Sequence, residues 1–163
     1  MCASAKPRER LAIVRGAVLV AVFALLAVSS LVTTSGLPNT ADGVLHLFRS
    51  LELVDCWREG ILYPRWAPHF AFGFGYPIFN YVPPLLHYLV GATSLPGLTT
   101  QDAMKAIVTL AVVAGSLGTY LFARQFLSTA AAALAGAAYA LPPYRLFELY
   151  IQGNYPQLLA TAI

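Results

Sequence analysis

The sequence predicts an all-α fold of the polytopic membrane class, with about four transmembrane helices in its 163 residues. Composition is the first reason: 58% of the residues are hydrophobic and only 10% are charged, whereas soluble domains average about 25% charged residues. The mean hydropathy of +0.67 agrees with this class. The third observation is an apolar run near the N-terminus of about 20 residues, the length that a helix needs to cross a bilayer.

The first predicted transmembrane helix is the apolar run of residues 11–32, which only Arg15 interrupts. Basic residues dominate the preceding segment, residues 1–10, whereas acidic residues slightly outnumber basic ones in the segment after the helix. Since cytoplasmic flanks are enriched in Lys and Arg, residues 1–10 are expected in the cytoplasm and the helix in the plasma membrane. A cleaved signal peptide, with a small-residue site at residues 27–29, is the alternative, although its apolar region would exceed the usual ~7–15 residues.

Residues 33–80 are predicted to form an extracytoplasmic loop, because nearly half of the charged residues and both tryptophans lie there. Apolar side chains recur at helical spacing over residues 43–59, which predicts an amphipathic helix on the membrane surface. Thr40 or Asp42 suits its N-cap, where a side-chain oxygen satisfies free backbone N–H groups. The stretch that follows, residues 63–77, interleaves aromatic residues with Gly and Pro and predicts an interfacial loop.

Residues 81–163 are predicted to hold the further transmembrane helices of the same domain. The candidates are the remaining apolar segments, residues 85–98, 106–122 and 128–141. Alanine and glycine dominate the last of them, which predicts close helix packing. A final apolar segment stops short, and a half-helix cannot satisfy its backbone within lipid. We therefore expect the chain to continue beyond Ile163, as the N-terminal part of a larger protein.

The orientation of these later segments follows from counting spans. Polar residues 99–105 separate the first two. Simple alternation then places Arg124 outside and both Lys105 and Arg145 inside. The positive-inside rule supports this arrangement only weakly.

Charge and cysteine content argue against two classes of function. A net charge of +3 is small and scattered, and no zinc-finger, RNP or P-loop spacing appears, so nucleic-acid binding is not expected. The two cysteines, Cys2 and Cys56, lie on opposite sides of the predicted membrane and form no metal-binding pair. We therefore expect neither a disulfide nor redox chemistry.

The predicted surface helix carries the first candidate site. Asp42, His46 and Arg49 are spaced i, i+4 and i+7, which places them on one helical face, opposite the apolar stripe and directed at water or a cleft. A carboxylate, an imidazole and a guanidinium together can bind a phosphate or metal–diphosphate headgroup and deprotonate a hydroxyl. The alternative is structural: Asp42 caps the helix, and Arg49 is a solvated charge paired along it.

Three further features have two interpretations each. Arg65 either holds a phosphate oxygen of a lipid-linked substrate with its planar fork of donors or stacks on Trp66. His87 lies in an apolar segment, where a packing role is favoured over a catalytic one. Residues 152–157 resemble a turn or a broken helix, which either lines a cavity or simply connects two spans.

Four motifs carry a resemblance to a known family. DGVLH at residues 42–46, GILYPRW at residues 60–66 and GFGYPIFNYVPP at residues 73–84 resemble, in this order, the GT-C-type membrane glycosyltransferases. With QGNYP at residues 152–156, the chain more narrowly resembles the membrane proteins labelled 6-pyruvoyl-tetrahydropterin synthase-related. That label is not literal, because the chain offers no three-histidine zinc site and its hydropathy excludes the soluble pterin synthase fold.

The resemblance implies a transferase that moves a sugar from a polyprenyl-phosphate donor, held in the membrane lipid, to an extracytoplasmic glycan, lipid or protein acceptor. It implies that Asp42 is the catalytic base or the ligand of a divalent metal. No second acid accompanies Asp42 in the sequence, so the metal dependence stays open and no other cofactor is expected.

The same resemblance suggests substrate-binding residues. His46 and Arg49 would orient Asp42 or bind phosphate, and Arg65 would contact the headgroup of the donor. Tyr76 and Asn80 belong to the segment that would shape the mouth of the cavity. The second hypothesis is a non-enzymatic multi-pass protein that transports or assembles lipid-linked glycans.

Overall fold

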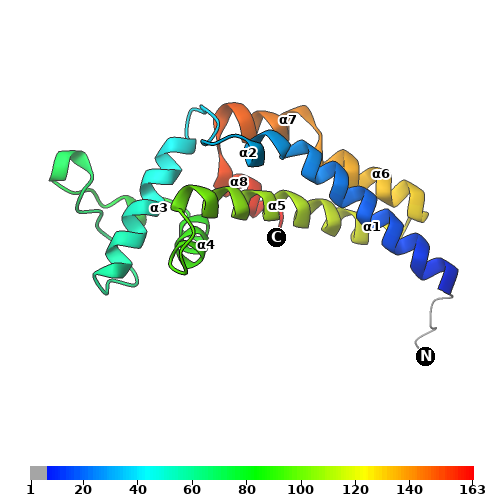
Figure 1. Cartoon of the computed structure of the whole chain (residues 1–163), viewed down its shortest axis with the longest axis horizontal. Helices are drawn as coiled ribbons and strands as arrows, with labels where there is room; N and C mark the ends of the chain where they lie inside the picture. The colour runs from blue at the N-terminus through cyan, green and yellow to red at the C-terminus, as the bar shows by residue number, and fades with distance from the viewer. Residues whose placement is uncertain (1–6) are drawn as a thin grey trace.

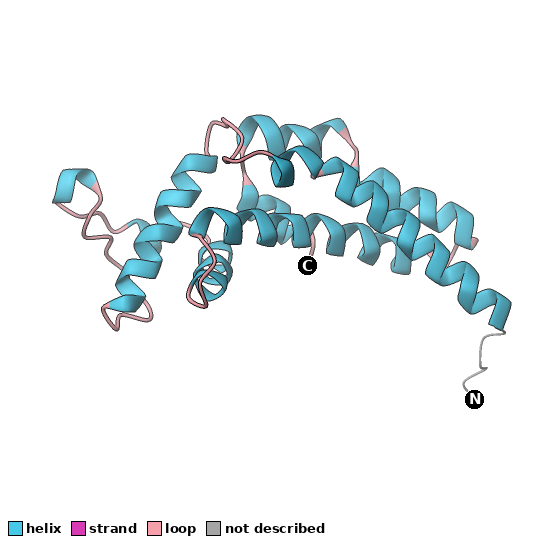
Figure 2. Ribbon diagram, viewed as in Figure 1, coloured by secondary structure: helices cyan, strands magenta, loops and turns pink. Residues whose placement is uncertain are grey.

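The computed structural model describes residues 7–163, and the regular elements in that range are all helices (Figure 2). The predicted all-α class is therefore confirmed. Extended pairing within these residues is limited to one isolated bridge between Ala67 and Tyr76.

Three helices lie lengthwise and side by side as a bundle: α1 (Pro7–Ala27), α5 (Thr100–Ala123) and α6 (Thr129–Ala140) (Figure 1). Beyond the break at residues 141–142, α7 (Pro143–Phe147) and the π-helix η3 (Glu148–Gln152) continue in the direction of α6. The hydroxyl of Tyr150 in η3 donates to the carbonyl of Ala27 at 2.8 Å. The broken path from α6 to η3 therefore reaches the far end of α1.

Two of the described helices, α1 from Arg8 onward and α5, are long and apolar enough to cross a membrane. The expectation of four transmembrane helices is not confirmed. The segment predicted at residues 85–98 forms only α4 (Leu85–Ser94), and α6 has 12 residues. A helix of 10 residues is about 15 Å long, roughly half the thickness of the hydrocarbon core.

The short helices at the end of the bundle run across it. Figure 1 shows α4 almost end-on while α5 lies lengthwise, and α3 (Gly43–Arg58) crosses the bundle end at a steep angle. The bounds of α3 confirm that a helix spans the predicted residues 43–59 to within one residue. After α3, the chain passes through two short 3-10 helices, η1 (Ala71–Gly73) and η2 (Ile78–Asn80), before α4 begins. It ends with α8 (Tyr155–Ala160), which turns back from η3.

Two helix boundaries differ from the prediction. The polar residues 99–105 form the N-cap and the first turns of α5, because the Thr99 hydroxyl accepts the Asp102 N–H at 3.1 Å and donates to the Asp102 carboxylate at 2.7 Å. The first apolar run is broken at Val28, and α2 (Ser29–Thr33) follows as a separate piece. By contrast, α6 begins where predicted, with Ser128 as its N-cap.

The close packing predicted for the small residues of α6 is present. A Cβ at Gly136 would lie 2.9 Å from the Ser116 carbonyl oxygen and 3.0 Å from Val20 Cγ1. Tyr120 is fully buried beside it and donates its hydroxyl to the Ile13 carbonyl at 2.9 Å. The largest apolar core lies nearer the other end of the bundle and includes Val28, Leu31, Leu86, Val90, Met104, Val108 and Leu158.

The close contacts of Gly136 with α5 and α1 yield a prediction. Gly136→Ala should lower the free energy of unfolding by about 1–3 kcal/mol, because the added methyl group meets a backbone carbonyl. Gly118→Ala on the exposed side of α5, where a Cβ meets nothing within 4 Å, should instead stabilise by about 0.5–1 kcal/mol. Thermal unfolding in detergent, followed by circular dichroism, measures both. Equal shifts in the melting temperature would contradict this packing.

Candidate functional site

The start of α3 is joined to the end of η3 by backbone hydrogen bonds. The N–H of Ala41 donates to the Ile151 carbonyl at 3.0 Å, and the N–H of Asp42 donates to the Gln152 carbonyl at 2.8 Å. Gly153 adopts a left-handed conformation with φ of 75°, and a Cβ there would lie 2.7 Å from the Gly43 nitrogen. Two motifs that are more than one hundred residues apart, 42–46 and 152–156, therefore meet at this junction.

The helix cap at this junction is made by Thr40 and not by Asp42. The Gly43 N–H donates to the Thr40 hydroxyl at 3.1 Å. Asp42 occupies the N-cap position, but its side chain makes no capping bond. Because Thr40 caps the helix, the Asp42 carboxylate is not required to satisfy the backbone of α3. Asp42 itself is half-buried.

His46 points inward, whereas the sequence analysis expected it to face water or a cleft. The residue is 7% exposed, and its ring centroid lies 5.7 Å from that of His87 on α4 and 6.2 Å from that of Tyr155 on α8. The expectation was wrong because the face of α3 that packs on the bundle is the one that carries Gly43, His46 and Ser50. The predicted apolar stripe is mostly exposed, with Val44, Phe48 and Leu51 outside, as a stripe that rests on lipid would be.

Burial keeps the imidazole of His46 neutral. It lowers the pKa of His46 from 6.5 to about 4, with a further lowering by the Arg49 charge and an opposing effect of Asp42. The three predicted residues therefore do lie close enough to interact electrostatically. Together they present a carboxyl group, an uncharged imidazole and a half-buried guanidinium.

A buried hydrogen bond links α3 to α4 behind His46. The Ser50 hydroxyl donates to the His46 carbonyl at 2.9 Å and lies 2.9 Å from His87 Nδ1. Because a hydroxyl has one proton, Ser50 then accepts from His87 Nδ1–H, which leaves His87 Nε2 unprotonated. Both His87 Nε2 and His46 Nδ1 are buried without a hydrogen-bond partner. Ser50 is not predicted by the sequence, where its only signal is its place one turn after His46.

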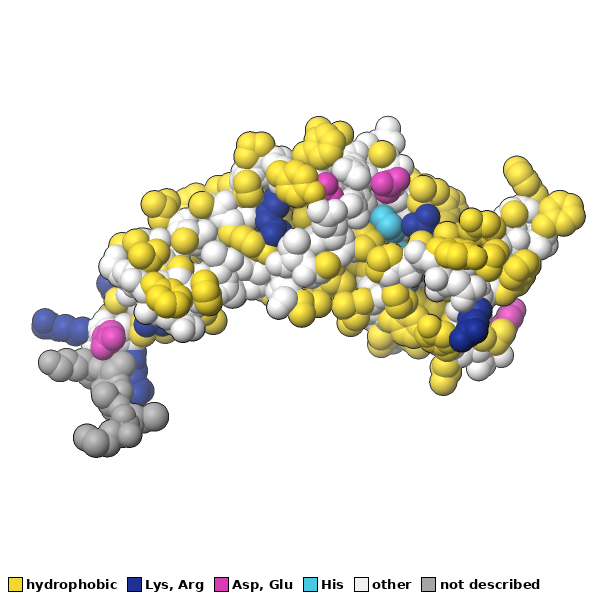
Figure 3. Space-filling view, turned by 180° about the vertical axis from the view of Figure 1, so that it is seen from behind, with side chains coloured by type: hydrophobic (Ala, Val, Ile, Leu, Met, Phe, Trp, Pro, Cys, Tyr) yellow, Lys and Arg dark blue, Asp and Glu magenta, His cyan; other side chains and the backbone are white. Residues whose placement is uncertain are grey.

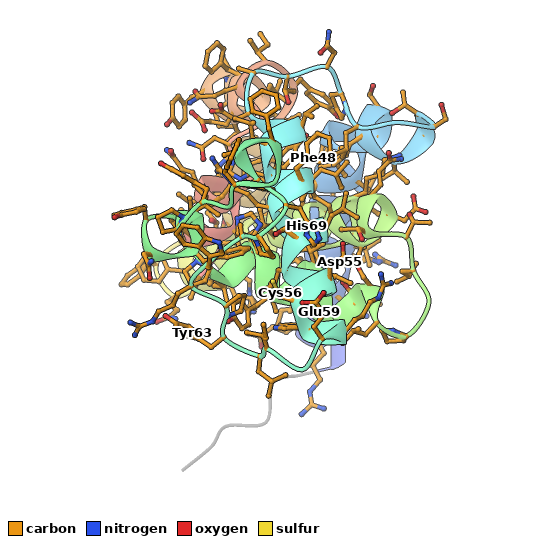
Figure 4. The ribbon with its side chains drawn as sticks, turned by 90° about the vertical axis from the view of Figure 1, so that its left-hand side faces the viewer. Phe48, Asp55, Cys56, Glu59, Tyr63 and His69 are labelled. Carbon is orange, nitrogen blue, oxygen red and sulfur yellow. The ribbon has the colours of Figure 1, made fainter. Side chains whose placement is uncertain are left out.

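A second contact holds the loop after α3. Glu52 is 5% exposed, and its carboxylate accepts the backbone N–H of His69 at 3.0 Å and contacts His69 Nδ1 at 3.1 Å. A groove of about 400 Å³ lies beside this pair. Figure 4 shows its residues Phe48, Asp55 and His69 grouped on the outer side of α3. Nothing in the spacing of Glu52 and His69 predicts this pair.

The other predicted substrate-binding residues belong to the loop that projects beyond α3, away from the bundle (Figure 1). Arg65 is exposed, and its carbonyl accepts from Asn80 Nδ2 at 3.3 Å. The backbone of Tyr76 pairs with Ala67 through bonds of 2.9 and 3.0 Å. No hydrogen bond or ring contact among the described residues joins these side chains to Asp42. Arg65 does not stack on Trp66 either, since the described cation–π contacts involve Arg124 and Arg145.

Within residues 7–163, no group of three or more His, Cys, Asp or Glu side chains could hold a metal ion. A divalent metal at Asp42 would therefore need further ligands from a substrate or from water.

Cys56 is buried, and burial is the main cause that raises the pKa of its thiol, with a smaller effect from the charge of Glu52. The raised pKa disfavours the reactive thiolate.

The chain matches no family model, no curated protein and no solved structure in the comparisons with known proteins.

The burial of His46 predicts a pH dependence of stability. Unfolding returns His46 to its ordinary pKa of 6.5, so the unfolded chain binds a proton that the folded chain does not bind as the pH falls from 6.5 toward 4. The free energy of unfolding should therefore be lower at pH 4 than at pH 7.5, by about 3 kcal/mol from His46 alone.

Denaturant titrations in detergent at the two pH values measure this loss of stability. The variant His46→Gln should lose markedly less stability on acidification than the natural chain, because glutamine does not titrate. Equal losses in the two proteins would show that His46 is protonated as easily in the fold as outside it.

Proposed function

We propose that this chain is part of a GT-C-type membrane glycosyltransferase that transfers a sugar from a polyprenyl-phosphate donor to an extracytoplasmic acceptor. The observation that supports this function best is the junction between residues 41–43 and 151–153. It joins two of the motifs on which the family resemblance depends, and it leaves the carboxylate of Asp42 unused by the helix cap beside it.

The chemistry proposed for this junction uses Asp42, Arg49 and His46, which lie close enough to interact electrostatically. The Asp42 carboxylate accepts the proton of the acceptor hydroxyl, whose oxygen then attacks the anomeric carbon while the polyprenyl phosphate leaves. Arg49 contacts phosphate oxygens. His46, neutral and buried beside them, orients Asp42 without adding a charge that would compete for it. The alternative role of Asp42 is that of a metal ligand: its carboxylate would then hold a divalent cation near the phosphate in place of acting as the base.

For the membrane arrangement, we propose three spans in place of four: α1, α5, and the broken path α6–α7–η3, with α3 and α4 in the interface. This arrangement places the start of α1 and the end of α5 on one side, as the bond between Tyr120 and Ile13 requires. Basic side chains then collect at that end, as Figure 3 shows near the start of α1, and they include Arg8, Arg15 and Arg124. The positive-inside rule favours this end as cytoplasmic.

The three-span arrangement predicts the sidedness of two loops, opposite to the simple alternation of four spans. In a chain with Cys2→Ser and Cys56→Ser, a cysteine at Leu98 should react with an impermeant maleimide in intact cells. A cysteine at Gln125 should react only after the membrane is permeabilised. Labelling of Gln125→Cys but not Leu98→Cys in intact cells would favour the four-span arrangement instead.

The catalytic proposal predicts that Asp42→Asn abolishes sugar transfer by the full-length protein while binding of the polyprenyl-phosphate sugar survives. Transfer and donor binding are measured in the same detergent samples, at matched salt and divalent metal. Asp55→Asn is the matched control, because Asp55 lies on α3 but pairs with Arg58 at 3.0 Å, and it should keep transfer within about twofold.

Intact transfer in Asp42→Asn would refute the catalytic role. Donor binding without transfer in the natural chain would instead favour the non-enzymatic alternative, in which a lipid-linked glycan is recognised but not altered.

A further inference from the structure

Lys105 is a buried cation that is not among the proposed catalytic residues. It lies one turn inside the start of α5, its side chain and backbone are together 8% exposed, and its ammonium donates to the Thr34 carbonyl at 2.6 Å. The described ion pairs are Arg58–Asp55 and His69–Glu52, so no carboxylate pairs with Lys105. An ammonium has three donors, and a buried cation is costly unless an opposite charge compensates it.

Lys105 lines a groove of about 550 Å³ between α1, α2 and α5. Most of its wall is apolar and comes from Leu25, Val32, Ala106, Leu110 and Val113. Lys105, Thr109 and Val113 follow one another at i, i+4 and i+8, so they line about 12 Å of α5 along one face. The groove is open to the outside, since Leu25, Val32 and Leu110 are 50%, 54% and 63% exposed.

A second polar group in this groove is without a partner. The Thr109 hydroxyl oxygen is buried and makes no hydrogen bond, although hydroxyls in helices ordinarily bond to the preceding turn. Asp102 is the one acidic residue at the rim, and its carboxylate already accepts from the Thr99 hydroxyl at 2.7 Å. The groove therefore offers unused donors at one end and apolar walls beyond them.

We propose that this groove binds a glycerophospholipid of net negative charge. One acyl chain lies against the apolar wall, a phosphate oxygen accepts from the Lys105 ammonium, and the Thr109 hydroxyl donates to a phosphate or ester oxygen. A lipid is the occupant that combines these two requirements, because the groove opens on an apolar exterior and ends at a cation. The site is independent of sugar transfer and of Asp42.

Native mass spectrometry of the full chain in detergent tests this site with added dioleoylphosphatidylglycerol or dioleoylphosphatidylcholine. The natural chain should retain one phosphatidylglycerol molecule more tightly than phosphatidylcholine. Lys105→Met should weaken phosphatidylglycerol binding by about tenfold. Lys105→Arg should largely restore it, because the charge returns. Arg58→Met, which removes the same charge from the exposed surface of α3, should leave binding within about twofold.

A second variant keeps the test valid if Lys105→Met fails to fold. Ala106→Phe fills the groove from its exposed wall without removing the ammonium, and it should also release the lipid. Unchanged phosphatidylglycerol binding in Ala106→Phe, or equal binding of the two lipids by the natural chain, would overturn the proposal. Displacement of the lipid by inorganic phosphate alone, or by polyprenyl phosphate at equal concentration, would likewise overturn it and identify a different occupant.

Discussion

The backbone bonds between residues 41–42 and 151–152 are the constraint on which the rest of this structure depends. They fix where α3 begins relative to the end of the bundle, and the close approach of Gly43 to Gly153 leaves no room for a side chain between them. With its start held there, α3 runs across the bundle end and turns the face that carries His46 toward α4 and α8. The positions of the candidate catalytic residues follow from this one junction.

The sequence predicted the features that local patterns determine. Composition indicated the all-α class, helical periodicity located α3, and the small residues of α6 indicated close packing. It could not predict the direction of α4, because hydropathy scores burial in lipid and burial in protein alike. A helical wheel places His46 and Asp42 near one face but does not reveal which face packs inward. The pair Glu52–His69 depends on how the loop folds back on α3, which no spacing shows.

The polar residues inside this end of the molecule are satisfied in different ways. Glu52 is compensated by two contacts from His69. Ser50 bonds to His87 Nδ1 while His87 Nε2 has no partner, and His46 avoids the cost of a buried charge by staying neutral. These contacts tie α3, α4 and the following loop together. Buried polar contacts can hold the exposed aromatic residues of this loop in a more defined position than purely apolar contacts would.

Lys105 differs from these groups because no carboxylate of the described chain pairs with its ammonium. The histidines are compensated by hydrogen bonds or by neutrality, and Glu52 by a residue of the same chain, whereas the Lys105 ammonium contacts one carbonyl oxygen. The unused hydroxyl of Thr109 lies one turn further along the same face. An uncompensated cation beside an apolar, outward-facing groove indicates a partner from outside the chain. In a membrane, the neighbouring molecule that supplies both a negative charge and an apolar chain is a phospholipid.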